Sequence, residues 1–398
     1  MFKKHKKLKF LLPLLSAVCV FSLLQIKPAQ TNNSELASLN SKYGLVGVEA
    51  LSETPYLSAF HPKGGLEAKL LNKTLPEKGV IVKLNNKSSQ KELQDVFVLN
   101  LRSTEEAERI AQSYENLDLV QYAEPNFTVE IAGSAETESE EAKSNLDKKS
   151  IESETVNKVI VAVIDSGADL EHPDLKNVVT TGRSFIDNAE KVADPVGHGT
   201  HISGIIAANS PAAEIMALQF TDGKTGKLSK LLQAIKFAAD NGAQVINLSL
   251  GLKEKPKSLE EAIRYAQDQG IIVVAATGNH KSNTPYYPAA FDLPNVIAVS
   301  ALDKNQQKLF LSNFGEWVDF SADGQDIYST FPGNSYAYRT GTSQAAAFVT
   351  ALVTNILSQS GNSFSTIYQE LEKISEPIEG EFAALLGRRI TTSLKDYQ

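Results

Sequence analysis

From about residue 158 onward, short apolar runs alternate with segments whose apolar residues recur at helical spacing. Residues 159–164 and 271–276 are continuous apolar runs, as expected for strands covered on both faces, and residues 245–250 form a further strand. Residues 230–240 and a segment that opens at Ser258 read as amphipathic helices. This alternation predicts an α/β fold with a parallel sheet and helices on both faces. Functional sites in such sheets form at the carboxyl ends of the strands.

The second of these helices carries a specific start signal. Ser258 is followed three positions later by Glu261, which is the capping-box pattern. In a capping box the serine hydroxyl accepts a hydrogen bond from a backbone N–H of the first turn, and the glutamate reaches back to the N–H of the serine. The sequence therefore predicts that Ser258 caps a helix running through Gln269.

A mixed α/β region of about residues 31–131 lies ahead of this alternation. A threonine followed by acidic residues indicates a helix start at Thr104, with the helix running through residue 111. Residues 34–40 are expected to be helical and to lead into a strand. The strand candidates are residues 45–48, 80–84 and 96–101.

The segment between the two regions, residues 132–157, is polar and rich in charged residues. It offers almost nothing to bury, so it is interpreted as a flexible acidic linker and a natural place for a maturation cleavage. A chain of 398 residues is long enough for two domains. The predicted organisation is a signal peptide at 1–30, a first domain at 31–131, the linker at 132–157 and a second domain at 158–398.

The extreme N-terminus indicates export. Five lysines between residues 3 and 9 precede the apolar run 10–24, which is interrupted by Pro13 and is shorter than the roughly 20 apolar residues of a membrane-spanning helix. We expect a secreted protein, and an uncleaved signal anchor is the alternative. The only cysteine, Cys19, lies inside this run, so disulfides and cysteine catalysis are not expected after its removal.

Composition excludes some classes of function. The formal net charge is −8, and no block of Lys and Arg occurs outside the extreme N-terminus, so no nucleic-acid partner is expected. The chain has six histidines but neither a His-Glu-x-x-His motif nor a cysteine cluster, which argues against a catalytic metal.

Two residues near strand ends are candidates for acid–base chemistry. Asp165 directly follows the run 159–164, and a carboxylate at a buried strand end requires a partner. His198 lies among small residues in Gly-His-Gly-Thr-His at 197–201, where its ring can reach a cleft and act as a general base. Taken alone, Asp165 is equally explained as a turn residue, and His198 as a helix-start residue or a metal ligand.

Two further residues are candidates for a nucleophile and an oxyanion donor. Ser343 lies at the start of a long apolar helix, where the helix dipole and a backbone N–H favour an oxyanion. Asn279 follows the apolar run 271–276, and its amide is a suitable oxyanion donor. Alone, Ser343 is more simply a helix cap and Asn279 a turn residue.

The four candidates together resemble one family. The chain order Asp, His, Ser on an α/β domain is the order of subtilisin. The sequence is similar to the subtilases, in family order, in Val-Ile-Asp-Ser-Gly at 163–167, His-Pro-Asp-Leu at 172–175, Gly-His-Gly-Thr-His at 197–201, Asn-Leu-Ser-Leu-Gly at 247–251, Ala-Ala-Thr-Gly-Asn at 275–279, Tyr-Pro-Ala at 287–289 and Gly-Thr-Ser-Gln-Ala at 341–345.

The resemblance implies a serine endopeptidase with a subtilisin-like three-layer sandwich. Asp165, His198 and Ser343 would form the catalytic triad working through an acyl-enzyme, and Asn279 would help to bind the oxyanion. Protein or peptide substrates would add as a β-strand to the domain, as the family's substrates do. The residues expected to bind the substrate are Ser249, Leu250, Gly251, Ala276, Thr277 and Gly278.

The first region resembles a subtilase propeptide, in residues 35–44 and 120–127. The resemblance implies a small α+β, ferredoxin-like domain that assists folding and inhibits the enzyme within the same chain until it is cleaved. An unrelated accessory domain is the alternative reading. The chain is expected to be monomeric.

The sequence departs from the family where many members bind calcium, because the link between residues 205–209 and 213–216 is short. Calcium is therefore either absent or bound elsewhere, and no cofactor is expected for the chemistry. Two alternatives to a general secreted protease are a dedicated processing protease for one leader or precursor peptide, and a catalytically silent binding protein with the same fold.

Overall fold

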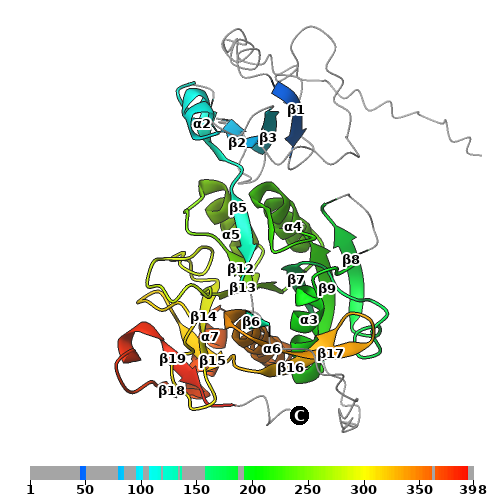
Figure 1. Cartoon of the computed structure of the whole chain (residues 1–398), viewed down its shortest axis with the longest axis vertical. Helices are drawn as coiled ribbons and strands as arrows, with labels where there is room; N and C mark the ends of the chain where they lie inside the picture. Colours follow the sequence, from blue (N-terminus) through cyan, green and yellow to red (C-terminus); the bar gives the residue numbers. More distant parts are fainter. Residues whose placement is uncertain are drawn as a thin grey trace, which may run out of the picture.

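The computed structural model describes nine stretches of the chain: residues 45–50, 79–84, 96–101, 107–117, 120–132, 135–136, 157–186, 192–360 and 364–392. Figure 1 shows a large C-terminal domain with a smaller N-terminal unit above it. The predicted signal peptide, the helix predicted at 34–40 and most of the predicted linker lie outside the described residues.

The large domain is built around a nine-stranded sheet in the order β18-β19-β15-β14-β13-β11-β7-β9-β8. Neighbouring strands are parallel except at the edge, where β18 runs antiparallel to β19. The three strands predicted from apolar runs form its centre as β7, β11 and β13. The bounds are β7 Val159–Asp165, β8 Val179–Ser184, β9 Ala213–Gln219, β11 Val245–Leu248, β13 Ile272–Ala276, β14 Val296–Leu302, β15 Phe320–Asp323, β18 Ser375–Pro377 and β19 Arg388–Ile390.

Helices cover both faces of this sheet and bury two hydrophobic cores against it. One core contains apolar residues of α4 (Leu228–Asp240) and α5 (Lys257–Asp268). The other contains residues of α3 (His198–Asn209), α6 (Thr342–Ser360) and α7 (Phe364–Lys373). The domain is thus a three-layer α/β structure with a mostly parallel sheet, which confirms the predicted fold class.

Short elements complete the edge of the sheet where strands deliver their carboxyl ends. The hairpin β16 (Ile327–Phe331) and β17 (Ser335–Thr340) packs near the start of α3 and pairs with β6 (Ala135–Glu136). At the opposite edge, where the strands begin, a 3₁₀ turn, η2 (Ala383–Leu385), precedes β19.

The N-terminal unit contains an antiparallel sheet in the order β1-β3-β2-β4 and one described helix. Its strands are β1 (Leu45–Ala50), β2 (Gly79–Leu84), β3 (Val96–Leu101) and β4 (Val120–Pro125), with α2 (Ala107–Glu115) between the last two. The three predicted strands are therefore present. Helix α2 contains residues 107–111 of the predicted helix and runs on to Glu115, and the predicted start at Thr104 lies outside the described residues. The ferredoxin-like arrangement stays a prediction, because the segments that join β1 to β2 and β2 to β3 are outside the described residues.

The chain leaves this unit through β5 (Thr128–Ile131), which descends into the large domain in Figure 1. There β5 forms the central strand of a second sheet, antiparallel to both β10 (Thr225–Lys227) and β12 (Leu250–Gly251). Strands β10 and β12 of the large domain therefore pair with the two edges of a strand that comes from the N-terminal unit.

The start of α5 differs from the predicted capping box. The helix begins at Lys257 after Pro256, and Ser258 lies inside its first turn. The Glu124 carboxylate, which comes from β4, accepts hydrogen bonds from the backbone N–H groups of Lys257 (2.9 Å) and Ser258 (3.1 Å) and from the Ser258 hydroxyl. The predicted cap is wrong because a distant residue supplies the acceptor that the box would have supplied.

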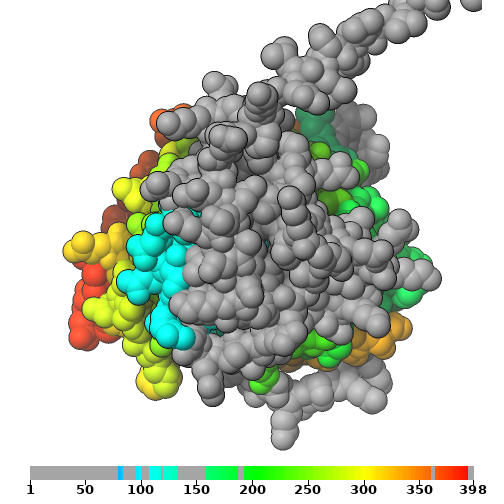
Figure 2. Space-filling model, turned by 90° about the horizontal axis from the view of Figure 1, so that it is seen from above, coloured from blue at the N-terminus to red at the C-terminus, as the bar shows by residue number. Residues whose placement is uncertain are grey.

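The predicted partner in the box, Glu261, also turns toward the N-terminal unit. It accepts hydrogen bonds from Lys83 Nζ at 2.8 Å and from Tyr122 Oη at 2.9 Å. In the space-filling view the cyan residues of the N-terminal unit lie beside yellow-green residues of the large domain (Figure 2). Among the described residues, helix α5 is thus one docking element for the N-terminal unit, and the start of α4 is another, because Asn126 accepts from the Ser229 N–H at 2.9 Å.

Candidate active site

Asp165 and His198 meet at the carboxyl end of the central sheet. Asp165 is the last residue of β7 and His198 is the first residue of α3. Asp165 Oδ1 lies 2.8 Å from His198 Nδ1, and both side chains are fully buried. Within the described part of the chain, His198 Nε2 has no hydrogen-bond partner. The carboxylate therefore fixes the imidazole so that Nδ1 carries the proton and Nε2 is the basic nitrogen.

A second buried carboxylate, Asp194, holds this pair in place. Its Oδ1 accepts from the Ser166 hydroxyl at 2.7 Å and from the Gly197 N–H at 2.8 Å, and its Oδ2 accepts from the Thr200 N–H (2.7 Å) and hydroxyl (2.6 Å). The Ser166 hydroxyl also lies 3.2 Å from Asp165 Oδ1. Asp194 thereby ties the first turn of α3, which carries His198, to the end of β7.

Two glycines allow the close approach of these elements. Gly197 has φ +77°, a conformation that residues with a Cβ rarely adopt. A Cβ at Gly199 would overlap the carbonyl oxygen of Gly167 and lie 3.1 Å from Asp165 Cβ. The small residues around His198 are therefore required for the helix to begin against the end of the aspartate strand.

Ser343 is the second residue of α6, and its hydroxyl faces the strand that enters from the N-terminal unit. Ser343 Oγ donates to the carbonyl oxygen of Ala132 at 2.8 Å. Behind it, Ser249 Oγ donates to the Ser343 carbonyl at 3.2 Å and accepts from Asn247 Nδ2 at 3.0 Å. Thr350, two turns along α6, donates to Asn247 Oδ1 at 2.9 Å. This buried network joins the start of α6 to the end of β11.

Asn279 lies next to Ser343, and its side chain is oriented by Thr342, the residue before Ser343. Its Oδ1 accepts from the Thr342 N–H at 3.0 Å and from the Thr342 hydroxyl at 3.1 Å. The donor end of the amide, Nδ2, lies toward Gly341, where an added Cβ would be only 2.8 Å away. The amide therefore offers its N–H groups beside the helix N-terminus, as an oxyanion donor must.

Three of the predicted substrate-binding residues hold the incoming strand. Leu250 pairs with Ile131 and Gly251 with Glu130, and Ser249 O accepts from the Ala132 N–H at 3.0 Å. On the other side of the strand, β10 pairs with residues 128–130. Farther along the chain, β6 pairs with β17.

The other three predicted residues, Ala276, Thr277 and Gly278, continue from β13. Gly278 N–H donates to the Thr342 hydroxyl at 3.1 Å, and Thr277 O accepts from Asn313 Nδ2 at 2.8 Å. They form a second backbone segment near the catalytic candidates. The structure thus brings all the predicted site residues to one end of the domain.

Comparison with known proteins identifies the family. Residues 156–373 match the model of the subtilase family, which is more than half of the chain. The chain belongs to the subtilase family. This subtilase is 38% identical over 305 residues to the thermophilic serine proteinase of Bacillus sp. strain AK1, covering 71% of the chain and 74% of the relative. It is 38% identical over 231 residues to thermitase of Thermoactinomyces vulgaris, covering 55% of the chain and 82% of the relative. The subtilase is accordingly a serine-type endopeptidase that acts on protein or peptide substrates.

Solved structures share the fold of this subtilase. Fervidolysin from Fervidobacterium pennivorans, described as a keratinolytic enzyme related to subtilisin, matches with a TM-score of 0.64 and 22% identity, over 80% of this chain and 60% of that chain. A cold adapted subtilisin-like serine proteinase matches with a TM-score of 0.55 and 23% identity, over 59% of this chain and 88% of that chain.

Several residues of the subtilase site were not predicted from the sequence. Thr342 donates to Asn279, Asp194 joins the segments that carry Asp165 and His198, and β10 pairs with the strand that enters the site. Asp194 has a recognisable signal, because an aspartate three residues before a Gly-His-Gly helix start is placed to accept from the N–H groups there. Strand β10 lies in a short glycine-containing segment without an apolar pattern, so its pairing with β5 had no signal.

A second histidine of α3, His201, has a structural role. Its Nε2–H donates to the carbonyl oxygens of Ile327 (3.2 Å) and Ala337 (3.1 Å) on the β16–β17 hairpin. Burial lowers the pKa of His201 to about 3, so the ring stays neutral at ordinary pH. His201 fixes the hairpin and is not a candidate base.

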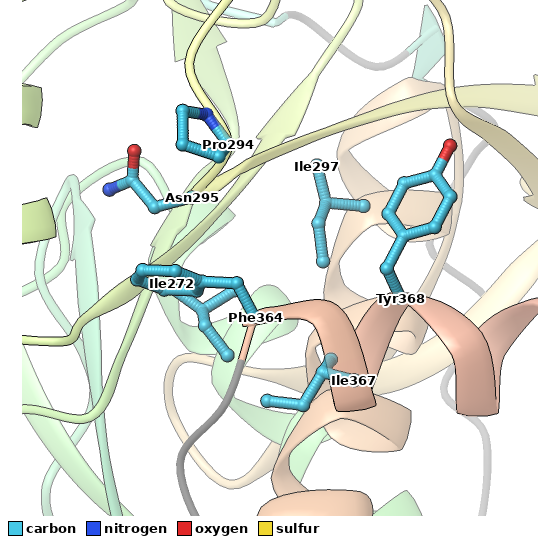
Figure 3. Close-up of a pocket in the computed structure, with 7 residues that line it drawn as sticks. All are labelled: Ile272, Pro294, Asn295, Ile297, Phe364, Ile367 and Tyr368. Carbon is cyan, nitrogen blue, oxygen red and sulfur yellow. The ribbon is translucent and has the colours of Figure 1, made fainter.

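The described residues contain no group of three or more His, Cys, Asp or Glu side chains suited to a metal ion, and no helix among them is long and apolar enough to cross a membrane. One small pocket lies at the amino ends of β13 and β14 (Figure 3). Its volume of about 10 Å³ suits at most one water molecule. It is lined by Ile272, Pro294, Asn295, Ile297, Phe364, Ile367 and Tyr368.

Proposed function

We propose that this protein is a secreted serine endopeptidase made as a self-inhibited precursor, with Asp165, His198 and Ser343 as its triad. The hydrogen bond of 2.8 Å from Ser343 Oγ to the Ala132 carbonyl oxygen carries the proposal. It joins the proposed nucleophile to a peptide carbonyl of a strand bound across the site. The hydrogen bond between Asp165 and His198 supports the assignment of these two residues to the triad.

The proposed reaction follows from this arrangement. The Ser343 hydroxyl turns its proton from the Ala132 carbonyl oxygen to His198 Nε2, which has no other partner among the described residues. His198 Nε2 takes this proton as Ser343 Oγ forms a bond to the carbonyl carbon, and Asp165 stabilises the imidazolium that results. The Asn279 amide and the Ser343 backbone N–H bind the oxyanion. The tetrahedral intermediate then collapses, the C–N bond breaks and His198 donates its proton to the leaving amine. Water hydrolyses the acyl-enzyme by the same proton transfers in reverse.

The bound strand supports self-inhibition and also indicates the maturation site. Residues 128–132 hydrogen bond to the large domain on both sides, through β10 and β12, as an extended substrate would. The carbonyl at Ser343 belongs to Ala132, so the bond that we propose is cut is Ala132–Gly133. The N-terminal unit, bound through Glu124 and Lys83 to α5, would keep this strand in the site after cleavage.

The lysine-rich start and apolar run of residues 1–24 support export, and we propose that the mature enzyme is extracellular and monomeric. Fractionation of the producing cells tests the first point, because the mature form should appear in the medium. Light scattering of the mature enzyme tests the second point. Recovery of active enzyme only with the membrane fraction would favour an uncleaved anchor.

The central test is expression of the chain beside its Ser343→Ala variant, followed by intact-mass analysis and casein digestion. The wild type should yield a fragment that begins at Gly133, and the variant should keep the bond intact and digest nothing. Thr342→Ser serves as a matched control, because it keeps the hydroxyl at the adjacent position. Failure of the wild type to cleave itself, to digest casein or to react with a serine-directed covalent inhibitor would overturn the proposal.

A further inference from the structure

A single tyrosine fills the space between the two backbone segments predicted to hold the substrate. A Cβ at Gly251, in β12, would lie 2.7 Å from Tyr286 Cδ1 and closer still to Cε1. A Cβ at Gly278, after β13, would lie 2.9 Å from Tyr286 Cδ1. Real Cβ atoms essentially never come this close to a neighbour, so the two glycines are in contact with the same ring. Tyr286 itself is 1% exposed.

The ring is held in this place by a hydrogen bond from its hydroxyl and by the backbone pairing of the next residue. Tyr286 Oη donates to the Gly251 carbonyl oxygen at 2.9 Å. The adjacent Tyr287 makes a two-way backbone bridge to Leu252, with distances of 2.8 and 2.9 Å. Burial, aided by the nearby negative charges of Glu130 and Glu254, raises the pKa of the Tyr286 hydroxyl, so it stays a neutral donor. A buried ring held in this way does not swing aside at low cost.

The strand that ends at the proposed scissile bond runs along β12, whose Gly251 contacts this tyrosine. Gly251 pairs with Glu130, and Ser249 O accepts from the Ala132 N–H, so β12 runs alongside the last residues before that bond. Ala132, whose carbonyl faces Ser343, is 1% exposed. Its methyl group is therefore already enclosed beside the Ser249–Gly251 segment, and the tyrosine ring fills the space between that segment and Gly278.

We propose that Tyr286 closes the pocket for the side chain preceding the scissile bond, so that this protease cleaves after alanine and similarly small residues. The inference rests on the proposed function, because it uses the same Ser343 and the same bound strand. A phenylalanine or leucine side chain at this position would have to displace a buried, hydrogen-bonded ring. Overfilling a closed apolar pocket in this way corresponds to a preference of roughly 10–100-fold for alanine in kcat/KM.

The test uses the mature enzyme that the full chain yields and four peptides Val-Glu-Ile-X with a chromogenic leaving group. The Val-Glu-Ile portion copies residues 129–131, and X is Ala, Leu, Phe or Lys. The wild type should cleave after alanine at least about 10-fold better than after the others. Tyr286→Gly should raise kcat/KM for phenylalanine relative to alanine by about the same factor. Tyr286→Phe, which keeps the ring, should keep the preference for alanine.

A second experiment leaves the large domain unchanged, so it does not depend on whether Tyr286→Gly folds. In the full chain, Ala132→Phe should slow cleavage after residue 132 by roughly 10-fold or more, and Ala132→Ser should leave it within about 3-fold of the wild type. Equal cleavage after phenylalanine and alanine by an enzyme that is labelled at Ser343 would overturn the inference alone. Absence of labelling and of all peptide cleavage would overturn the proposed function and the inference with it.

Discussion

Replacing Glu124 with alanine should loosen the N-terminal unit from the large domain. The Glu124 side chain accepts from two backbone N–H groups at the start of α5 and from the Ser258 hydroxyl, and the residue is 9% exposed. Nothing in an alanine side chain replaces these acceptors. The first turn of α5 would then lose its cap in the bound state, whereas water can satisfy it after dissociation.

The magnitude follows from the groups left unpaired. An unsatisfied buried donor costs about 1–3 kcal/mol, and loss of a helix cap costs about 1 kcal/mol. Because the two estimates describe the same N–H groups, we take about 2 kcal/mol for the whole change. This value corresponds to a roughly 30-fold rise in the dissociation constant of the cleaved N-terminal fragment. Glu115→Ala is the matched control, because the exposed Glu115–Lys257 ion pair at 3.5 Å is expected to contribute little.

The pH dependence gives a second readout. Burial raises the pKa of the Glu124 carboxyl, against the opposing effect of the donors from Ser258 and Lys257. A raised pKa in the complex means that binding takes up protons. This contribution to affinity is fully present below the pKa of the free carboxyl and is lost as the pH rises through the raised pKa. Glu124→Gln keeps one acceptor oxygen and cannot titrate, so its affinity should lack this dependence.

The assay is recovery of peptidase activity when the self-cleaved complex is diluted, since the proposed self-inhibition makes the free enzyme active and the complex inactive. The activity midpoint for Glu124→Ala should move to about 30-fold higher concentration than for the wild type. An unchanged midpoint, with the large domain shown to be folded by its thermal transition, would refute the role of Glu124 in docking.

Three further predictions concern the first turns of α3. Asp194→Asn should cost about 2–4 kcal/mol of unfolding free energy and lower kcat, because an amide has one acceptor oxygen for the donors that both carboxylate oxygens now serve; urea denaturation and steady-state kinetics measure both. Gly199→Ala should lower the free energy of unfolding by about 1–3 kcal/mol, because the added methyl group would overlap the Gly167 carbonyl oxygen. A fall in melting temperature of less than about one degree would contradict this prediction. The folded-state pKa of His201 is depressed to about 3, so its contribution to stability is present above pH 6.5 and is lost below it at up to about 1.4 kcal/mol per pH unit. Urea denaturation from pH 7 to 5 should show this slope in the wild type and a reduced slope in His201→Gln.

The fold and the candidate site residues could be predicted because their sequence signals are local. Strands β7 and β13 are covered on both faces, so their apolar runs marked them, and Asp165 and Asn279 stand within a few residues of their ends. Parallel strands deliver their carboxyl ends to one edge of a sheet, which is why residues as distant as Asp165 and Ser343 could be expected together.

The contacts that could not be predicted from a local sequence pattern all join segments that are distant in the chain. Glu124 takes the place of the capping box at α5 from 133 positions away, and Ala132 meets Ser343 across 211 positions. Tyr286 belongs to a polar stretch before Tyr287-Pro-Ala, where nothing local distinguishes a buried ring from an exposed one. Its position depends on where Gly251 and Gly278 lie, and that is a property of the assembled sheet.

For the proposed self-inhibited precursor, cleavage and activation are expected to be separate events. After the Ala132–Gly133 bond breaks, residues 128–132 would still be paired on both sides, and Glu124 and Lys83 would still be bound to α5. None of these contacts includes the peptide bond that is cut. The product strand therefore competes with substrates until the whole N-terminal unit departs. Mutations on the α5 surface should consequently change the time at which activity appears after self-cleavage, and mutations at Ser343 should abolish the cleavage itself.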